Sequence, residues 1–363
     1  SIDGSTGEVF NSQIPVAPST VVQYLHDGIT SATEGKDEDT QDLIRSVDRL
    51  LRHADRRRKL MVRANADTET DASNARRFGA QGIGLCRTEH MFLGDRRVLI
   101  ERVILAKDTA SREDALAALL PLQKSDFTKI LEEMDGFTTT IRLLDPPLHE
   151  FLPDYTALSV KVAVADERGE ATDADRNLLQ AVGRMHEANP MLGLRGVRLG
   201  IMFPGLFALQ VRAIAEATAV RLLEKGDPHA EIMVPLVATV AELEPVRREA
   251  EAIIAEVSQK YGVEMHIPIG TMIELPRAAL TAQRIARSAD FFSFGTNDLT
   301  QTTWGFSRDD VEAAFFSEYL DRKLEQLDPV VRYLWPIPVA STSFTITSGL
   351  SALPVIAGTL KMP

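Results

Sequence analysis

The chain has 363 residues, with 40 Lys and Arg against 52 Asp and Glu, which gives a formal net charge of −12 at pH 7. At about 150 residues per domain, this length suggests two domains or one large domain with an appendage. Apolar residues make up 44% and charged residues 25%, as in globular proteins, so a wholly disordered chain is excluded. A chain this acidic has no diffuse affinity for nucleic acid or anionic membranes, and any phosphate site must be a local cluster of Arg or Lys.

The single cysteine, Cys86, cannot form an internal disulfide, which is typical of a reducing compartment. No apolar run reaches the roughly 18 residues that a membrane helix needs. The polar, Gly-rich start, Ser1–Glu8, lacks the apolar core of a signal peptide. We therefore expect a cytoplasmic protein with neither a nucleic-acid nor a membrane partner.

Residues 1–59 predict a small helical segment. A short amphipathic stretch lies near Val21–Leu25, and the segment from Asp37 to Lys59 has apolar residues at spacings of three and four, which predicts a helix. The basic end of this helix, Arg56–Lys59, could form a nucleic-acid patch. Cations are favoured at any helix C-terminus, however, and we prefer that explanation.

From Leu60 onward, short β-rich runs alternate with helical patterns. Strands are predicted at residues 60–64, 82–87, 139–144, 231–235, 269–274 and 291–295, and helices most clearly at 207–223, 240–257 and 276–286. This alternation predicts an α/β fold with a parallel sheet. A barrel of this kind takes about 250 residues, which favours a (β/α)8 TIM-type barrel over an open sheet.

Only six of the eight barrel strands can be recognised, so the barrel is predicted to be incomplete. The connections at residues 88–137 and 146–230 are too long for simple loops and must hold further helices. After Asp328-Pro329 the pattern breaks, and the stretch 339–347 is the one remaining strand candidate.

Polar and charged residues gather at the predicted C-terminal strand ends, where parallel barrels place their active sites. They are Asn65, Asp67, Arg87, Glu89, Arg142, Asp145, Glu274, Asn297 and Asp298. Arginine offers a planar fork of donors to phosphate or carboxylate oxygens. Two carboxylates, Glu274 and Asp298, would leave most positions of a hard cation to substrate and water, as Mg²⁺ prefers. Each residue alone is as well explained by a surface salt bridge, but the set predicts a site for a phosphorylated acid and a divalent cation.

Three shorter features invite a functional interpretation. Gly295–Asp298 follows a strand, and we predict a loop whose backbone N–H groups can cradle an oxyanion. Gly79–Gly84 superficially resembles a dinucleotide-binding loop, but it precedes a strand, so we interpret it as a helix end and strand entry. Cys86 could be a nucleophile. If Arg87 points into the barrel mouth, however, strand alternation turns Cys86 toward the helices, which favours a buried structural thiol.

Five blocks of the sequence stand out: GLCRTEHMF (84–92), IRLLDPPLHEFLP (141–153), NPMLGLRGVRLG (189–200), GTMIELPRAAL (270–280) and FFSFGTNDLTQTTWGFSRDD (291–310). Together they closely resemble the PEP-utilising enzymes, and within that group the pyruvate, phosphate dikinase family. PEP synthase and enzyme I of the sugar phosphotransferase system share the site, but the DPPLHEFLP block argues against both. The segment IDGSTGEV (2–9) resembles the end of the family's phosphohistidine domain.

The resemblance implies three parts: the end of a phosphohistidine domain with a helical linker (1–59), a PEP/pyruvate-binding barrel (60–329) and a divergent tail (330–363). The family's barrel binds pyruvate or PEP with Mg²⁺ and exchanges a phosphoryl group with a histidine on a separate domain. The phosphohistidine loop and the ATP-grasp domain of the family are not in this chain.

The resemblance also implies roles for particular residues. Arg87 and Arg142 resemble the arginines that hold the phosphoryl group and the enolate, and Glu274 and Asp298 resemble Mg²⁺ ligands that also contact substrate. The residues that resemble the rest of the site are Gly295, Thr296 and Asn297, which line the substrate, and Asp145 and Arg195, which support it.

Two family features have no counterpart here: a Gly-x-Cys-Gly-Glu-type block, whose cysteine protonates the enolate carbon, and a final Ser-Pro-Phe-Arg-like strand. No catalytic residue is therefore identified. Two alternatives follow. The chain could be an inactive interaction protein that keeps the family's helical dimer surface and pairs with a full-length relative. Separately from this alternative, the chain could form a homodimer. It could also fold poorly, because a barrel lacking two strands exposes a parallel edge.

Overall fold

The computed structural model describes residues 19–106, 108–307, 310–311, 314–322 and 343–346. The chain divides into two compact units. One takes in the chain up to Val62 together with Arg77–Ala80, and the other takes in Arg63–Arg76 and the chain from Gln81 onward. The segment 2–9, which resembles a phosphohistidine domain, and the tail after residue 329 apart from 343–346 lie outside the described residues.

The first unit is built from two helices that pack on each other, α1 (Thr20–Thr33) and α2 (Glu38–Arg57). Asp37 caps α2, because its carboxylate accepts a hydrogen bond of 2.9 Å from the backbone N–H of Thr40. Arg56 and Arg57 occupy the last turn of α2, where the helix dipole favours cations. This placement agrees with our preferred explanation of the basic run.

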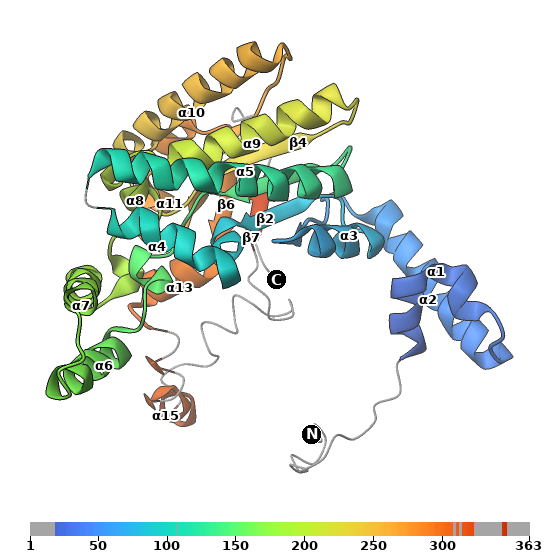
Figure 1. Cartoon of the computed structure of the whole chain (residues 1–363). Coiled ribbons are helices and arrows are strands. Elements are labelled where there is room, and N and C mark those ends of the chain that lie inside the picture. Colours follow the sequence, from blue (N-terminus) through green and yellow to red (C-terminus); the bar gives the residue numbers. More distant parts are fainter. Residues whose placement is uncertain (1–18, 107, 308–309, 312–313, 323–342, 347–363) are drawn as a thin grey trace. The chain divides into compact units, whose positions relative to one another are not determined.

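The second unit is organised around one sheet with the strand order β1-β2-β3-β4-β5-β6-β7. Strands β2, β4, β6 and β7 are labelled in Figure 1. Its strands are β1 (Ala64–Asn65), β2 (Ile83–Arg87), β3 (Thr138–Arg142), β4 (His229–Val234), β5 (Ile269–Ile273), β6 (Phe292–Gly295) and β7 (Ser343–Ile346). The first six strands are parallel and neighbour one another in chain order, whereas β7 is antiparallel to β6. The predicted α/β fold, an incomplete TIM-type barrel with six recognisable strands, is confirmed.

The predicted strand at residues 60–64 is wrong over most of its length. Leu60, Met61 and Val62 are 82%, 63% and 59% exposed, and pairing begins only at Ala64. The stretch 339–347 does contain a strand, β7, which covers the side of β6 that we expected to be an exposed parallel edge. The antiparallel pairing was not predicted.

The helices of the second unit occupy the connections between strands. They are α3 (Glu69–Arg77), α4 (Arg97–Leu105), α5 (Thr109–Glu133), α6 (Tyr155–Glu167), α7 (Asp173–Met185), α8 (Gly196–Met202), α9 (Leu206–Leu223), α10 (Val240–Tyr261), α11 (Pro276–Leu280), α12 (Ala282–Ile285), α13 (Thr296–Trp304) and α15 (Phe316–Asp321). Five short 3-10 turns accompany them: η1 (Thr88–Phe92), η2 (Gly94–Arg96), η3 (Leu148–Phe151), η4 (Pro190–Leu192) and η5 (Ala286–Ser288).

Both long connections hold several helices, as the sequence predicts. Helix α9 packs against α5 and against α10, and the three lie side by side in Figure 1. The helix predicted at 276–286 is divided into α11 and α12, because Thr281 leaves the helical region with φ −111° and ψ 15°. Within the described residues no single helix is long and apolar enough to cross a membrane, although α8 and α9, bent by 104°, pass that test together.

Strand alternation sorts the side chains into two environments. Leu85, Met233, Met272 and Phe291 form a small buried cluster of their own, separate from the main core between sheet and helices. Cys86 belongs to the main core and is fully buried, so it faces away from the cluster of its neighbour Leu85. The same alternation puts the residue two positions after each cluster residue on the cluster's side of the strand. This arrangement positions the candidate site.

Candidate functional site

The candidate site lies at the C-terminal ends of strands β2 to β6. Arg87 and Arg142 end adjacent strands and are direct register partners. Arg87 follows Leu85 by two positions and Glu274 follows Met272 by two, so both lie on the side of the small buried cluster. The ends of β2, β3 and β5 thus contribute charged side chains to one region, because parallel strands end at a common edge.

A chain of ion pairs, buried except at the partly exposed Asp298, links four residues of the site. Arg142 contacts Asp145 at 2.9 Å, Asp145 contacts Arg195 at 2.6 and 3.2 Å, and Arg195 contacts Asp298 at 3.0 Å. Burial opposes ionisation of Asp145, but the charges of Arg142 and Arg195 outweigh it and hold the pKa of this carboxyl below its ordinary value. Burial likewise acts to lower the pKa of both guanidinium groups, and the carboxylates around them raise it. All three groups therefore stay charged.

Arg142 has a second carboxylate partner, Glu89, which pairs with its guanidinium from the turn after β2. The other oxygen of Glu89, Oε2, and the Nε of Arg142 are buried with no hydrogen-bond partner within the described structure. Buried polar atoms that lack partners are uncommon, and a ligand can satisfy them. The sequence places Glu89 at a strand end but gives it no role.

Glu274 is completely buried. Its Oε1 accepts a hydrogen bond of 2.6 Å from the backbone N–H of Leu236, whereas Oε2 has no partner among the described residues. Burial, followed by the negative charges of Asp145 and Asp298, raises the pKa of Glu274 to about 8. This buried oxygen lacks a hydrogen-bond partner, so it is the feature of the site that most clearly indicates a ligand.

Two backbone features hold this carboxylate in place. A Cβ on Gly295 would stand 2.3 Å from Glu274 Oε2, so only glycine fits there. Leu236, which donates to Oε1, has a φ of 60°, a left-handed conformation that is strained for a branched apolar residue. Sequence reasoning missed Leu236, and no pattern in the chain marks it, because its contribution is a backbone N–H.

The segment Gly295–Asp298 begins a helix, so our expectation of a loop is wrong. Gly295 precedes α13, which runs from Thr296, and Asp298 lies in its first turn, where an acidic residue is a typical helix-start signal. We predicted that the backbone N–H groups of Gly295–Asp298 bind an oxyanion. A helix start is compatible with that role, since the first N–H groups of a helix lack intrahelical acceptors and favour anions. Thr296 and Asn297 are half-buried, and Asn297 Oδ1 has no hydrogen-bond partner within the described structure.

Arg87 is held separately from the ion-pair chain. Asp67, from the loop after β1, accepts hydrogen bonds from the Arg87 backbone N–H at 2.7 Å and from its Nε at 3.0 Å. The Nη2 of Arg87 lies 2.8 Å from the same carboxylate, and so does the Nδ1 of His90 at 2.7 Å. Arg87 therefore reaches the region of Arg142 through strand register, with its own carboxylate support.

The residues present fit a hard divalent cation. Within the described ranges no group of three or more His, Cys, Asp or Glu side chains is arranged to hold a metal ion. Among the described residues, Glu274 Oε2 and Asn297 Oδ1 are buried oxygens without hydrogen-bond partners, and the carboxylate of Asp298 directly follows Asn297. A cation that keeps several waters or substrate oxygens needs only such a partial set of protein ligands, which suits Mg²⁺.

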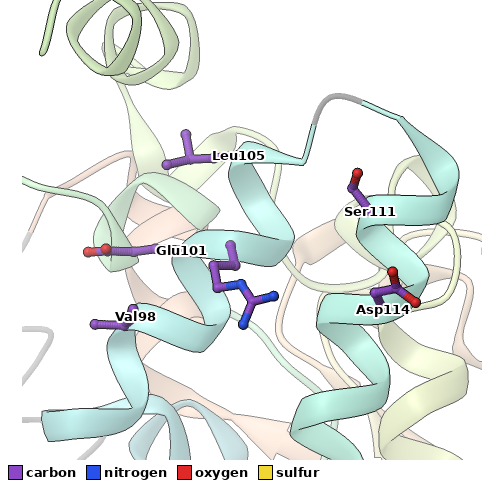
Figure 2. Close-up of a pocket in the computed structure, with 6 residues that line it drawn as sticks. Val98, Glu101, Leu105, Ser111 and Asp114 are labelled. Atoms are coloured by element: carbon purple, nitrogen blue, oxygen red, sulfur yellow. The ribbon is translucent and has the colours of Figure 1, made fainter. Parts of the chain in front are cut away.

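Two other features do not belong to this set of charged side chains. An open hollow of about 420 Å³ lies between α4 and α5 and is lined by Val98, Glu101, Arg102, Leu105, Ser111 and Asp114, none of which is a predicted site residue. Figure 2 shows these side chains. Burial, followed by the charges of Asp67 and Glu89, raises the pKa of the Cys86 thiol well above its ordinary value. A neutral, fully buried thiol agrees with a structural role.

Comparison with known families agrees with the fold. Residues 42–334 match the family described as PEP-utilising enzyme, PEP-binding domain. The chain therefore belongs to the PEP-utilising enzymes and carries their PEP-binding domain, which confirms the resemblance seen in the sequence.

Its similar relatives are pyruvate, phosphate dikinases. The chain is 47% identical over 332 residues to that of Rhizobium meliloti (strain 1021), and 44% identical over 332 residues to that of Giardia intestinalis. It is 45% identical over 334 residues to the chloroplastic pyruvate, phosphate dikinase 1 of Arabidopsis thaliana. Each match covers 91% of this chain but 34%, 34% and 32% of the relative, so the chain spans about a third of their length.

Proposed function

We propose that the barrel binds pyruvate or PEP together with Mg²⁺, as the substrate-binding part of a pyruvate, phosphate dikinase-type phosphotransferase. One observation carries this proposal. The ion-pair chain from Arg142 to Asp298 lies beside a buried carboxylate, Glu274, whose second oxygen has no hydrogen-bond partner in the part of the chain that the structure describes. Cationic forks and a partial set of hard oxygen ligands are what a small phosphorylated acid and its cation require.

The reaction would interconvert pyruvate and PEP through a phosphohistidine on a separate domain. The enolate oxygen of pyruvate forms a bond to phosphorus as the phosphorus–nitrogen bond of the phosphohistidine breaks, and the reverse reaction runs from PEP. Arg87 and Arg142 would stabilise the negative charge on the transferring group and the enolate, an effect that is large in a buried site. Mg²⁺, held by Glu274 and Asp298, would supply Lewis-acid stabilisation of the same charge.

The surrounding residues keep these groups in fixed positions. Asp145 holds Arg142 and Arg195 in one arrangement, so little reorganisation is needed when a ligand binds. The N–H groups at the start of α13 offer further donors to an anionic ligand. The proton transfer at the methyl carbon has no assigned residue, since the family's cysteine block has no counterpart in this sequence.

Thermal unfolding with Mg²⁺ and oxalate, a mimic of the enolate, tests the proposal. A ligand that binds only the folded state at 100 times its Kd stabilises it by about 2.7 kcal/mol. We expect the melting temperature to rise when both ligands are present, and to rise much less with either alone. A cooperative melt that ignores the pair would refute the proposal and favour the non-catalytic interaction protein. The absence of a cooperative melt would mean that the incomplete barrel is not stable.

A further inference from the structure

The carboxylate of Asp67 accepts hydrogen bonds from both the backbone N–H and the guanidinium of Arg87, and no role has been assigned to it so far. We propose that Asp67 is a positioning residue that fixes the Arg87 guanidinium in the orientation that receives an anionic ligand. The inference rests on the proposed function, because it assigns how one of the two strand-end arginines is prepared for the phosphorylated substrate.

The contacts define a clamp from one buried side chain. Asp67 is 8% exposed, and its Oδ1 accepts the backbone N–H of Arg87 at 2.7 Å, which ties the loop after β1 to the end of β2. Its Oδ2 accepts from the Nε of Arg87 at 3.0 Å and lies 2.8 Å from Nη2. Two of the three guanidinium nitrogens are thus fixed by the same carboxylate that fixes the backbone of the residue.

The Asp67 carboxylate is itself held in place. His90, from the turn that follows β2, lies with Nδ1 2.7 Å from Oδ2, and because a carboxylate in this role only accepts, Nδ1 donates. The backbone N–H of Asp67 also contacts the carboxylate of Asp71 at 3.4 Å. Contacts on both oxygens leave Asp67 little freedom to turn away from Arg87.

Two physical readings of this pair predict opposite effects on an anionic ligand. If Asp67 only neutralises Arg87, its removal raises the positive potential of the site and strengthens anion binding. If it positions Arg87, its removal frees a long side chain that must then be ordered on binding, and anion binding weakens. The shared backbone and side-chain contacts favour positioning, because charge neutralisation alone needs no contact with the Arg87 N–H.

The chain provides a matched control. Asp126 on α5 also holds an arginine with both oxygens, since it pairs with Nη1 of Arg96 and accepts from Nη2 at 3.1 Å. This pair joins α5 to the turn η2 and includes no predicted site residue. Asp126→Asn therefore removes the same chemistry from a comparable arginine pair outside the candidate site.

The experiment measures PEP binding to the whole chain by calorimetry in the presence of Mg²⁺. We expect Asp67→Asn to weaken PEP binding about tenfold, or about 1.4 kcal/mol, and Asp126→Asn to leave it within about twofold. The double variant Asp67→Asn with Arg87→Gln should bind as Arg87→Gln does, because a positioning residue acts through its partner. If Asp67 had a merely structural role, its replacement would weaken PEP binding by the same factor in the parent chain and in Arg87→Gln.

A second variant leaves Asp67 intact in case its replacement prevents folding. Arg87→Lys keeps the charge but cannot present the planar fork that the carboxylate holds, so we expect it to lose nearly as much affinity as Arg87→Gln. PEP binding that is unchanged or stronger in Asp67→Asn, or largely kept in Arg87→Lys, would overturn this inference and leave the proposed function standing. If the parent chain binds no PEP with Mg²⁺, the proposed function fails and the inference fails with it.

Discussion

Replacement of Glu274 by Gln should make the metal-free protein more stable at alkaline pH. The sign follows from the raised pKa of this buried carboxyl, about 8 against an ordinary 4.5. A carboxyl whose pKa is raised by folding favours the protonated form, so its contribution to the unfolding free energy is fully present below pH 4.5. That contribution is lost as the pH rises toward 8. Gln keeps the acceptor for the Leu236 N–H and removes the ionisation.

The size of the stability difference between the parent and Glu274→Gln follows from the interval between the ordinary pKa of 4.5 and the raised pKa of about 8. Each pH unit between 4.5 and about 8 costs about 1.4 kcal/mol, which amounts to about 5 kcal/mol of unfolding free energy at pH 8.5. Other titrating groups affect the parent and the variant alike, and their effects cancel in the difference. We therefore expect near-equal stability at pH 4.5 and a widening advantage for Glu274→Gln up to pH 8.

Urea unfolding in excess EDTA, at pH steps from 4.5 to 8.5, measures this difference directly. Equal stability of the two proteins at pH 8.5, or a less stable variant, would refute the reasoning. Adding Mg²⁺ provides an internal check, because a cation competes with the proton for Oε2 and its affinity should rise with pH. In Glu274→Gln the stabilisation by Mg²⁺ and oxalate should be largely lost at every pH.

Two further variants and one labelling experiment test other parts of the site and core. Gly295→Ala places a Cβ 2.3 Å from Glu274 Oε2, so we expect a loss of about 1–3 kcal/mol in urea unfolding and no response to Mg²⁺ with oxalate; an unaltered response would contradict this packing. Asp145→Asn removes the carboxylate shared by Arg142 and Arg195, which keep only Glu89 and Asp298 as partners, and should cost about 3 kcal/mol at pH 7, the low end for breaking a buried ion pair. Because folding lowers the pKa of Asp145, the parent should lose this advantage as the pH falls through 3.8 and below, and a gap that stays constant in acid would argue against the ion pair. Cys86 should react with iodoacetamide at pH 8 only after unfolding in urea, and fast labelling of the native chain would exclude the buried neutral thiol.

The sequence predicts five of the six parallel strands well, because each is a short apolar run between helical patterns. The same signal fails at residues 60–64, since apolarity alone does not separate a strand from an exposed linker. The start of α13 could have been predicted from Asp298, an acidic residue placed to stabilise a first turn. The pairing of β7 could not, because antiparallel partners are chosen by tertiary context rather than by local pattern.

For the site, the sequence identifies residue types at strand ends but not their partners. Arg142, Asp145, Arg195 and Asp298 were all expected near the mouth, yet only the structure links them in one chain. Glu89 and Leu236 contribute through contacts across separate strands, which no local spacing encodes. Long-range contacts of this kind are set by how the sheet closes.

The alternation of side chains along the strands also limits which length changes the chain can accept. Glu274 lies on the side of the small buried cluster because it follows Met272 by two positions, and Arg142 lies there because it is the register partner of Met233. A shift of either strand by one residue would move these side chains to the other side of the sheet. Deleting one residue within β3 would turn the guanidinium toward the helices and bring Ile141, now in the main core, toward the barrel axis. A change that alters neither net charge nor composition appreciably would thus abolish ligand binding. Insertions in the long connections between strands, which leave this parity intact, should be tolerated far better.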